Sequence, residues 1–142
     1  MNILFVEDDS NAIELARLLA ERGHTVTEAD NLLDAHYYLT IEPKIDCYDI
    51  IFFDLSLPYP PAHSLEKMNF TIKSSLVGWD YLKQQILTKH PEQKSKVVIY
   101  SAYSRMLNDE IGEETYSSLK IVNKTGPDIV EQAEKFIEEM KK

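Results

Sequence analysis

The stretch "YDIIFFDL", residues 48–55, is the strongest indication of the fold class. Six of its eight residues are apolar or aromatic, which is typical of a strand buried on both faces at the centre of a parallel sheet. The strand pattern ends at an acid, Asp54. A second apolar run at residues 3–6 ends the same way, because Glu7 and Asp8 follow it directly. Two buried strands therefore end in carboxylates.

Strand and helix patterns alternate along the rest of the chain. Gly112 interrupts the fourth helix pattern, and Pro127 stands in the first turn of the fifth. Five repeats of strand then helix predict a flavodoxin-like α/β fold, a doubly wound five-stranded parallel sheet in the order 2-1-3-4-5. The further strands are predicted at 24–29, 96–102 and 119–124, and the helices at 10–23, 31–39, 78–90, 105–119 and 127–142.

Composition excludes several classes of function. The 142 residues predict one domain, and the 44% hydrophobic content predicts an ordered, globular chain. The net charge of -9 disfavours direct contact with nucleic acid. No apolar run is long enough for membrane insertion, and Met1 leads directly into a strand pattern without a signal peptide, so we expect a cytoplasmic protein. Cys47 is the only cysteine, so no disulfide framework or cysteine-based zinc site is expected.

The predicted topology brings the acids together. In the order 2-1-3-4-5 the first and third strands are neighbours, and ligands bind in the crevice at their carboxyl ends. Glu7, Asp8 and Asp54 should meet there. Carboxylates placed so close repel one another unless a cation lies between them, which indicates a metal site. The alternative for Glu7 and Asp8 is a surface role at the start of a helix, where the helix dipole favours negative charge.

Two further polar residues follow strands at the same edge of the sheet. Ser101 comes at the end of the strand pattern at 96–102, and Lys124 at the end of 119–124. Singly, Ser101 could cap the next helix and Lys124 could lie in a solvated loop. Together with the three acids they describe a phosphoryl-transfer site, which has ligands for a cation, a carboxylate nucleophile and two groups that bind phosphoryl oxygens.

These motifs resemble the receiver domains of two-component response regulators. The matching segments are "ILFVEDD" with Glu7 and Asp8, "DIIFFDLSLP" with Asp54, "VVIYSA" with Ser101, and Lys124. The resemblance implies that Asp54 is the phosphoacceptor and that Lys124 and Ser101 bind the phosphoryl group. It also implies that Asp8 and Asp54 ligate Mg²⁺ directly, with Mn²⁺ as a substitute. Glu7 then acts mostly through water, the backbone carbonyl of Ser56 completes the protein ligands, and Asp9 starts the helix.

The function implied by the resemblance is that of a stand-alone signalling switch over residues 1–142. Its partners are a histidine kinase or a histidine phosphotransfer protein and a downstream protein target. It is not an enzyme beyond its own phosphorylation and dephosphorylation. One alternative is a pseudo-receiver that binds proteins without being phosphorylated. Another is a haloacid-dehalogenase-type phosphatase, against which Ser56 counts because that chemistry needs an acid two residues after the nucleophile.

Several residues depart from the receiver pattern. Ile121 stands where the family usually has a switch aromatic, and Thr125 replaces a proline that is joined by a cis peptide, so we expect a trans bond or a rebuilt loop. Tyr103 could shield the phosphoryl group from water. The loop after the third strand is much longer than usual, with an insertion at about 59–75. Its apolar residues should either pack onto the domain or meet a partner.

Overall fold

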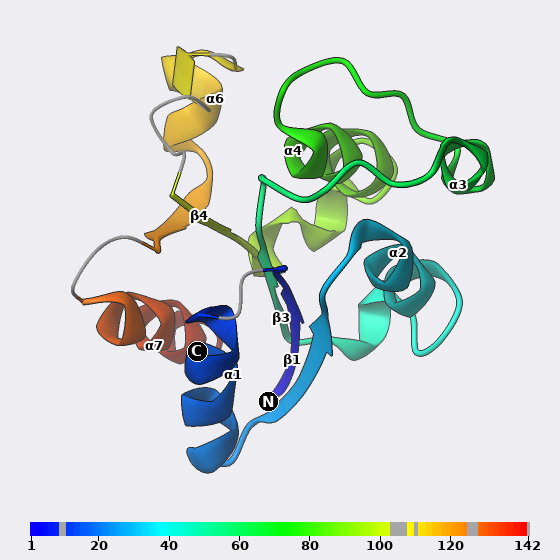
Figure 1. The fold of residues 1–142 in the computed structure, drawn as a ribbon. Coiled ribbons are helices and arrows are strands. Elements are labelled where there is room, and N and C mark those ends of the chain that lie inside the picture. Colours follow the sequence, from blue (N-terminus) through cyan, green and yellow to red (C-terminus); the bar gives the residue numbers. More distant parts are fainter. Residues whose placement is uncertain (9–10, 103–107, 110, 125–127, 142) are drawn as a thin grey trace.

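The computed structural model contains a five-stranded parallel sheet in the order β2-β1-β3-β4-β5 (Figure 1). It describes residues 1–142 except 9–10, 103–107, 110, 125–127 and 142. The strands are β1 (Asn2–Val6), β2 (Thr25–Ala29), β3 (Ile50–Phe53), β4 (Val97–Ser101) and β5 (Lys120–Asn123). Both the predicted fold class and the predicted strand order are confirmed.

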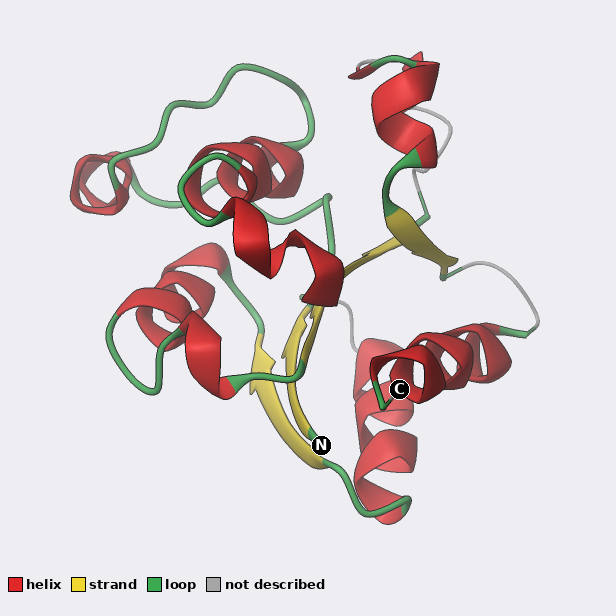
Figure 2. Cartoon of the chain, turned by 180° about the vertical axis from the view of Figure 1, so that it is seen from behind, coloured by secondary structure: helices red, strands yellow, loops and turns green. Residues whose placement is uncertain are grey.

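Helices follow the strands and cover both faces of the sheet (Figure 2). The α-helices are α1 (Asn11–Glu21), α2 (Leu32–Thr40), α3 (Ala62–Met68), α4 (Val77–Tyr81), α6 (Glu113–Ser117) and α7 (Ile129–Met140). Further helical segments are η1 (Ile45–Cys47), η2 (Leu82–Leu87) and η3 (Pro91–Lys96). Of these, η1 and η3 are 3₁₀ helices and η2 is a π-helix.

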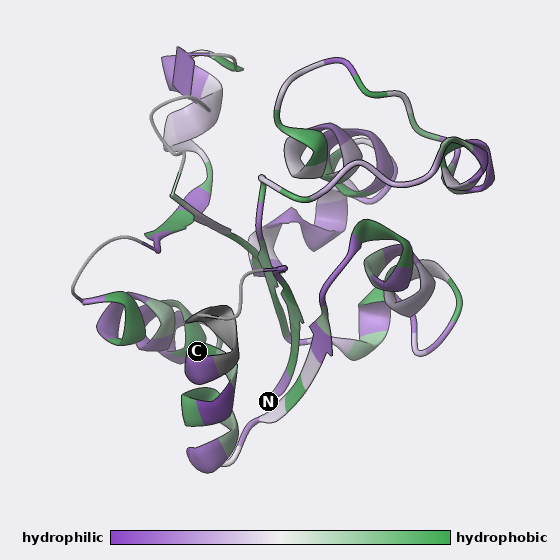
Figure 3. Ribbon diagram, in the orientation of Figure 1, coloured by the Kyte–Doolittle hydropathy of each residue, from purple (hydrophilic) through white to green (hydrophobic). Residues whose placement is uncertain are grey.

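The core has two layers because the side chains of each strand alternate between the faces of the sheet. On one face, Phe5, Phe52 and Tyr100 pack with residues of α1 and α7. On the other face, Phe53 and Ile99 pack with α2, α4 and the insertion. The central strands β1 and β3 are coloured as hydrophobic in Figure 3, and all four residues of β3 are fully buried. The segment that predicted the fold therefore lies at its centre.

Two predicted helices differ from their patterns. The pattern at 78–90 begins as an α-helix in α4 but continues as the π-helix of η2. The pattern at 105–119 breaks at Gly112, as predicted, because this residue has a φ of 86°, a conformation that disrupts helices and suits glycine. The expected place of Pro127 in the first turn of the last helix lies outside the described residues.

The insertion packs onto the domain. Met68 and Phe70 are buried, and Leu65 and Ile72 are partly buried against the same core. The ring of Phe70 meets that of Tyr81 edge-on at 5.4 Å between centroids. These apolar residues therefore pack onto the domain, and contact of the insertion with a partner stays a prediction.

Side-chain hydrogen bonds from α4 and η2 fasten the insertion in place. Asp80 accepts three, from the backbone N–H groups of Lys73 and Ser74 and from the Ser74 hydroxyl, at 2.8, 2.9 and 3.1 Å. Gln84 bonds both the N–H and the carbonyl of Thr71. Gln85 donates to two carbonyls at the end of α3, those of Met68 and Asn69. The insertion thus has a defined place beside α4.

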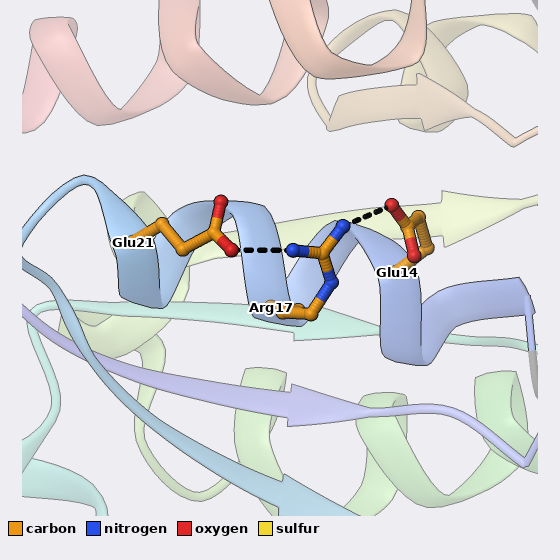
Figure 4. Close-up of polar contacts among 3 residues, drawn as sticks. All are labelled: Glu14, Arg17 and Glu21. Carbon is orange, nitrogen blue, oxygen red and sulfur yellow. Dashed lines mark hydrogen bonds and ion pairs between the residues drawn. The ribbon is translucent and has the colours of Figure 1, made fainter.

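The outer surface of α1 is polar and carries ion pairs. Arg17 lies between Glu14 and Glu21, one helical turn away on either side, and bonds both carboxylates (Figure 4). These side chains are more than half exposed, so the pairs contribute little to stability. Within the described part of the chain, no helix combines the length and apolar character needed to span a membrane.

Candidate functional site

The carboxyl ends of β1, β3 and β4 are held in register by backbone hydrogen bonds. The Asp54 N–H donates to the carbonyl of Val6 at 2.9 Å, so Asp54 lies beside the end of β1. On the other side, the Lys124 N–H donates to the carbonyl of Ser101 at 3.3 Å. The parallel pairing thus brings residues from four separate segments to one edge of the sheet.

Three carboxyl groups converge at this edge. One carboxylate oxygen from each of Glu7, Asp8 and Asp54 lies within 4.8 Å of the others. Asp54 is fully buried and Glu7 is 7% exposed, whereas Asp8 faces solvent. The predicted convergence is therefore present. The alternative that Glu7 is a surface acid at the start of a helix is wrong, because its side chain is buried.

Lys124 reaches into the cluster. Its Nζ donates to Glu7 Oε2 at 2.9 Å and lies 3.5 Å from Asp54 Oδ2. Burial alone would lower the pKa of Lys124, but the hydrogen bond to Glu7 and the charges of Asp54 and Glu7 outweigh it and raise the pKa. The ammonium is therefore charged at neutral pH. A single ammonium faces three carboxyl groups, an arrangement suited to a further cation.

The two carboxylate oxygens of Asp54 differ. Oδ1 accepts a hydrogen bond from the Ser56 N–H at 3.1 Å. Oδ2 is buried and has no hydrogen-bond partner among the described residues, although the Lys124 ammonium is close. The ion pair with Lys124 offsets part of the cost of burying Oδ2, and a buried carboxylate oxygen without a hydrogen bond often contacts an ion or ligand. One oxygen of Asp54 is thus held by the backbone N–H of Ser56, and the other faces the Lys124 ammonium.

Tyr100 and Ser101 end β4 next to Lys124. Ser101 ends β4 and is fully buried, so it is not merely a surface helix cap. The ring centroid of Tyr100 lies 5.7 Å from Lys124 Nζ, within the range of a cation–π contact. The sequence patterns did not single out Tyr100. Its position directly before Ser101, at the end of a buried strand, is the feature of the sequence that could have predicted its place beside the site.

Gly78 connects the insertion to the acidic site. Its N–H donates to the carbonyl of Leu55 at 2.8 Å, and a Cβ at this position would overlap the carbonyl oxygen of Asp54. Only glycine allows α4 to begin so close to the end of β3. The first turn of α4 is therefore in direct contact with the backbone of Asp54.

Comparison by sequence gives no match, either to a family model or to a curated protein. Comparison by structure gives many matches. The bacteriophytochrome response regulator AtBRR superposes with a TM-score of 0.64 at 20% identity, covering 99% of this chain and 91% of that one. The receiver domain of Francisella response regulator 1452 gives 0.63 at 20% identity and 97% coverage of both chains. The response regulator TrrA from Thermotoga maritima, in complex with Mg²⁺-BeF, gives 0.55 at 20% identity, covering 98% of this chain and 97% of that one.

The fold is that of a response regulator receiver domain. The resemblance predicted from the four motifs is confirmed at the level of the fold, over nearly the whole chain.

The departures from the receiver pattern are partly visible in the structure. Ile121 lies on β5, is partly buried and packs against the core on the α4 side of the sheet, so an aliphatic side chain occupies this position. The expectations for Asp9 as a helix start, for Tyr103 as a shield and for the peptide bond before Thr125 fall on residues outside the described part of the chain.

Proposed function

We propose that this chain is a phosphoacceptor receiver that is phosphorylated on Asp54. One observation carries the proposal. The buried carboxylate of Asp54 has an oxygen without a hydrogen bond among the described residues, and around it gather Glu7, Asp8 and the Lys124 ammonium. A buried nucleophile beside a cation-binding cluster and a fixed ammonium is suited to accept a phosphoryl group.

The transfer requires an in-line displacement at phosphorus. A carboxylate oxygen of Asp54 forms a new O–P bond while the P–N bond of a phosphohistidine donor breaks, and the leaving imidazole takes up a proton from solvent. The Ser56 N–H holds Oδ1 of Asp54, which leaves Oδ2 as the attacking oxygen. Lys124 offsets the repulsion between Asp54 and the incoming phosphoryl oxygens. The Ser101 hydroxyl donates a hydrogen bond to one of those oxygens.

The residues present fit a divalent cation with a preference for oxygen ligands. Glu7, Asp8 and Asp54 supply carboxylate oxygens within 4.8 Å of one another, and the Ser56 backbone carbonyl is the further ligand that the receiver resemblance implies. Mg²⁺, or Mn²⁺ in its place, would supply positive charge against the phosphoryl oxygens when bound. A neighbour in fold, TrrA, was solved with Mg²⁺-BeF, which supports this choice of ion.

The proposed role is a signalling switch in the cytoplasm. A histidine kinase or a histidine phosphotransfer protein supplies the phosphoryl group, and a downstream protein reads the phosphorylated state. The chain catalyses only its own phosphorylation and dephosphorylation, as one receiver domain with the insertion at 59–75. Ser56 is exposed and carries no acid, which counts against the haloacid-dehalogenase-type phosphatase as the alternative.

Incubation with acetyl phosphate and Mg²⁺, followed by intact-protein mass spectrometry, tests the proposal. The wild type should gain one phosphoryl group, and Asp54→Asn should gain none. Asp46→Asn is the matched control, because it makes the same chemical change at an exposed aspartate that is not part of the acidic cluster. It should be labelled like the wild type. EDTA should abolish the labelling.

Two results would count against a phosphoacceptor at this position. Equal labelling of the wild type and Asp54→Asn would move the acceptor to another residue. No labelling of any variant, with several small-molecule donors and with Mg²⁺ or Mn²⁺, would favour a pseudo-receiver that uses the same fold as a binding module.

A further inference from the structure

The large hydrophobic side chains that are most exposed lie in one region of the described molecule. They are Leu33, Tyr37, Ile41 and Tyr59, with exposed fractions of 43%, 46%, 58% and 65%. The first two belong to α2, Ile41 is its C-cap, and Tyr59 lies in the segment that leads into α3. We name these four residues the α2 patch. Isolated exposed hydrophobic residues are ordinary, but a group of them marks a binding surface.

Helix α2 has two apolar sides. Leu32, Ala35 and Leu39 are buried against the sheet, as expected for one face of an amphipathic helix. Leu33 and Tyr37 are spaced by four residues, and Ile41 continues the same row. Residues four apart share a side of a helix, so these three form an exposed stripe about 12 Å long, at about 1.5 Å per residue. Figure 3 shows hydrophobic colour on α2 as well as on the central strands.

A groove lies next to the Leu33 end of this stripe. It has a volume of about 320 Å³, and its walls are the start of α2, including Leu33 and Asp34, and the segment Pro58 to Pro61, which contains Tyr59. The prolines restrict the backbone of that wall. Beyond it, the insertion is held by the hydrogen bonds of Asp80 and Gln85. A preformed wall lowers the entropy cost of binding, so the groove is suited to a partner.

The charges around the patch indicate which charge a binding partner should carry. Three exposed acids, Asp30, Asp34 and Glu42, lie beside the stripe, and two exposed cations, Lys44 and Lys89, lie near α2. The whole chain carries a net charge of -9. A second copy docked through this patch would bring like charges together, and an anionic lipid surface would be repelled. A partner with Lys or Arg beside its apolar residues is instead complementary.

We propose that the α2 patch binds an amphipathic helix of a partner protein, with an apolar stripe and basic flanks. The apolar side of that helix packs along Leu33, Tyr37 and Ile41, and one of its larger side chains enters the groove beside Tyr59. Its basic residues pair with Asp34 and Glu42. Tyrosine is enriched at such interfaces because it offers a large apolar ring with a polar end. The binding needs no phosphoryl group on Asp54.

The test uses a synthetic probe with the proposed chemistry. The probe is a Leu/Lys amphipathic peptide of about 18 residues, long enough to form a helix, and its control is a Leu/Glu peptide with the same apolar stripe. Titration calorimetry and amide NMR shifts measure binding to the unphosphorylated protein. The Leu/Lys peptide should bind with shifts centred on residues 30–44 and 58–61, and the Leu/Glu peptide should bind at least about tenfold more weakly.

Variants separate patch binding from general attraction to an acidic protein. Tyr37→Ser with Ile41→Ser should weaken the Leu/Lys peptide about tenfold or more, with an unchanged unfolding midpoint in urea because both side chains are exposed. Asp34→Asn with Glu42→Gln should also weaken it. Glu113→Gln with Glu114→Gln removes the same charge from α6 and should not.

Three results would overturn the proposal. The first is equal affinity of the wild type and the Tyr37/Ile41 variant for the Leu/Lys peptide. The second is an equal loss of affinity in the α6 control variant, which would assign the binding to net charge. The third is self-association in sedimentation velocity that disappears with Tyr37→Ser, which would assign the patch to a second copy of the chain.

Discussion

Replacing Gly78 by alanine perturbs the candidate site through the backbone alone. The added Cβ would overlap the carbonyl oxygen of Asp54, and it would come within 2.7 Å of Leu55 Cα and 2.8 Å of Leu55 O. Ordinary contact begins at 3.4 Å, so α4 must move away from the end of β3. The movement stretches the 2.8 Å hydrogen bond from the Gly78 N–H to the Leu55 carbonyl. The atoms of Asp54 and Leu55 that the methyl group would meet belong to the backbone, so they cannot move aside as a flexible side chain could.

The expected cost follows from three contributions. Forcing a methyl group into a packed site costs about 1–3 kcal/mol. Weakening the hydrogen bond to Leu55 adds about 1 kcal/mol. Alanine favours a helix over glycine by up to about 1 kcal/mol, which offsets part of the loss within α4. The free energy of unfolding should therefore fall by about 2 kcal/mol for Gly78→Ala.

Urea unfolding measures this cost, and phosphorylation by acetyl phosphate measures its effect on the site. Gly78→Ala should be labelled more slowly than the wild type, because the strain falls on the backbone of Asp54. Gly23→Ala is the control. It has a φ of 93° and no atom within 4 Å of the place that the added methyl group would take, so it is destabilised only by backbone strain, about 1–2 kcal/mol. Its labelling should be normal. A Gly78→Ala protein as stable and as readily labelled as the wild type would refute the close approach of α4 to Asp54.

Three further predictions concern the metal, the insertion and pH. Asp8→Ala should weaken Mg²⁺ binding more than Glu7→Ala, because Glu7 is hydrogen-bonded to Lys124 while Asp8 faces solvent. The titration is followed by the fluorescence of the single tryptophan, which is next to Gly78. Equal Mg²⁺ affinities of the two variants would contradict this prediction. Gln85→Ala should lower the free energy of unfolding by about 2 kcal/mol, because two carbonyls at the end of α3 lose their hydrogen-bond donor. Amide hydrogen exchange within residues 62–76 should become faster. Unchanged exchange there would show that Gln85 does not hold the insertion in place. Burial, with a smaller contribution from Lys89, lowers the pKa of His36 below 6.5, so the folded state disfavours its protonation. Stability should fall as the pH drops through 6.5 toward the lower folded value, and His36→Gln should show a shallower decline in urea midpoints between pH 7.5 and 5.5.

The sequence predicted the architecture and the convergence of three acids with Lys124 at one edge of the sheet. The runs at 3–6 and 48–55 predicted buried strands, and parallel topology then placed Glu7, Asp8 and Asp54 together. Strands and helices can be predicted from local sequence because each has its own spacing of apolar residues. The hydrogen bond between Lys124 and Glu7 joins residues 117 positions apart, and the sequence predicted their proximity but not which carboxylate the ammonium would choose.

The insertion and α2 show where the patterns were insufficient. The packing of the insertion depends on Asp80 and Gln85, most of whose partners in the insertion are backbone groups, and backbone partners leave no signal in the sequence. The pattern over η2 predicts an ordinary α-helix, because a π-helical segment of six residues inside a longer helix is too short to show a different apolar spacing. The second apolar side of α2 was part of the pattern at 31–39, but only the structure shows that Tyr37 and its neighbours remain exposed.

Mapping the phosphoryl group to its residue shows whether Asp54 is the phosphoacceptor. The wild type is labelled with acetyl phosphate and Mg²⁺ and then treated with sodium borohydride, which reduces an acyl phosphate to an alcohol and converts a phosphorylated aspartate to homoserine. Peptide mass spectrometry should find homoserine at position 54 and at no other aspartate. Homoserine at Asp8 or elsewhere, or a label on histidine with Asp54 unmodified, would contradict the assignment of Asp54 as the phosphoacceptor.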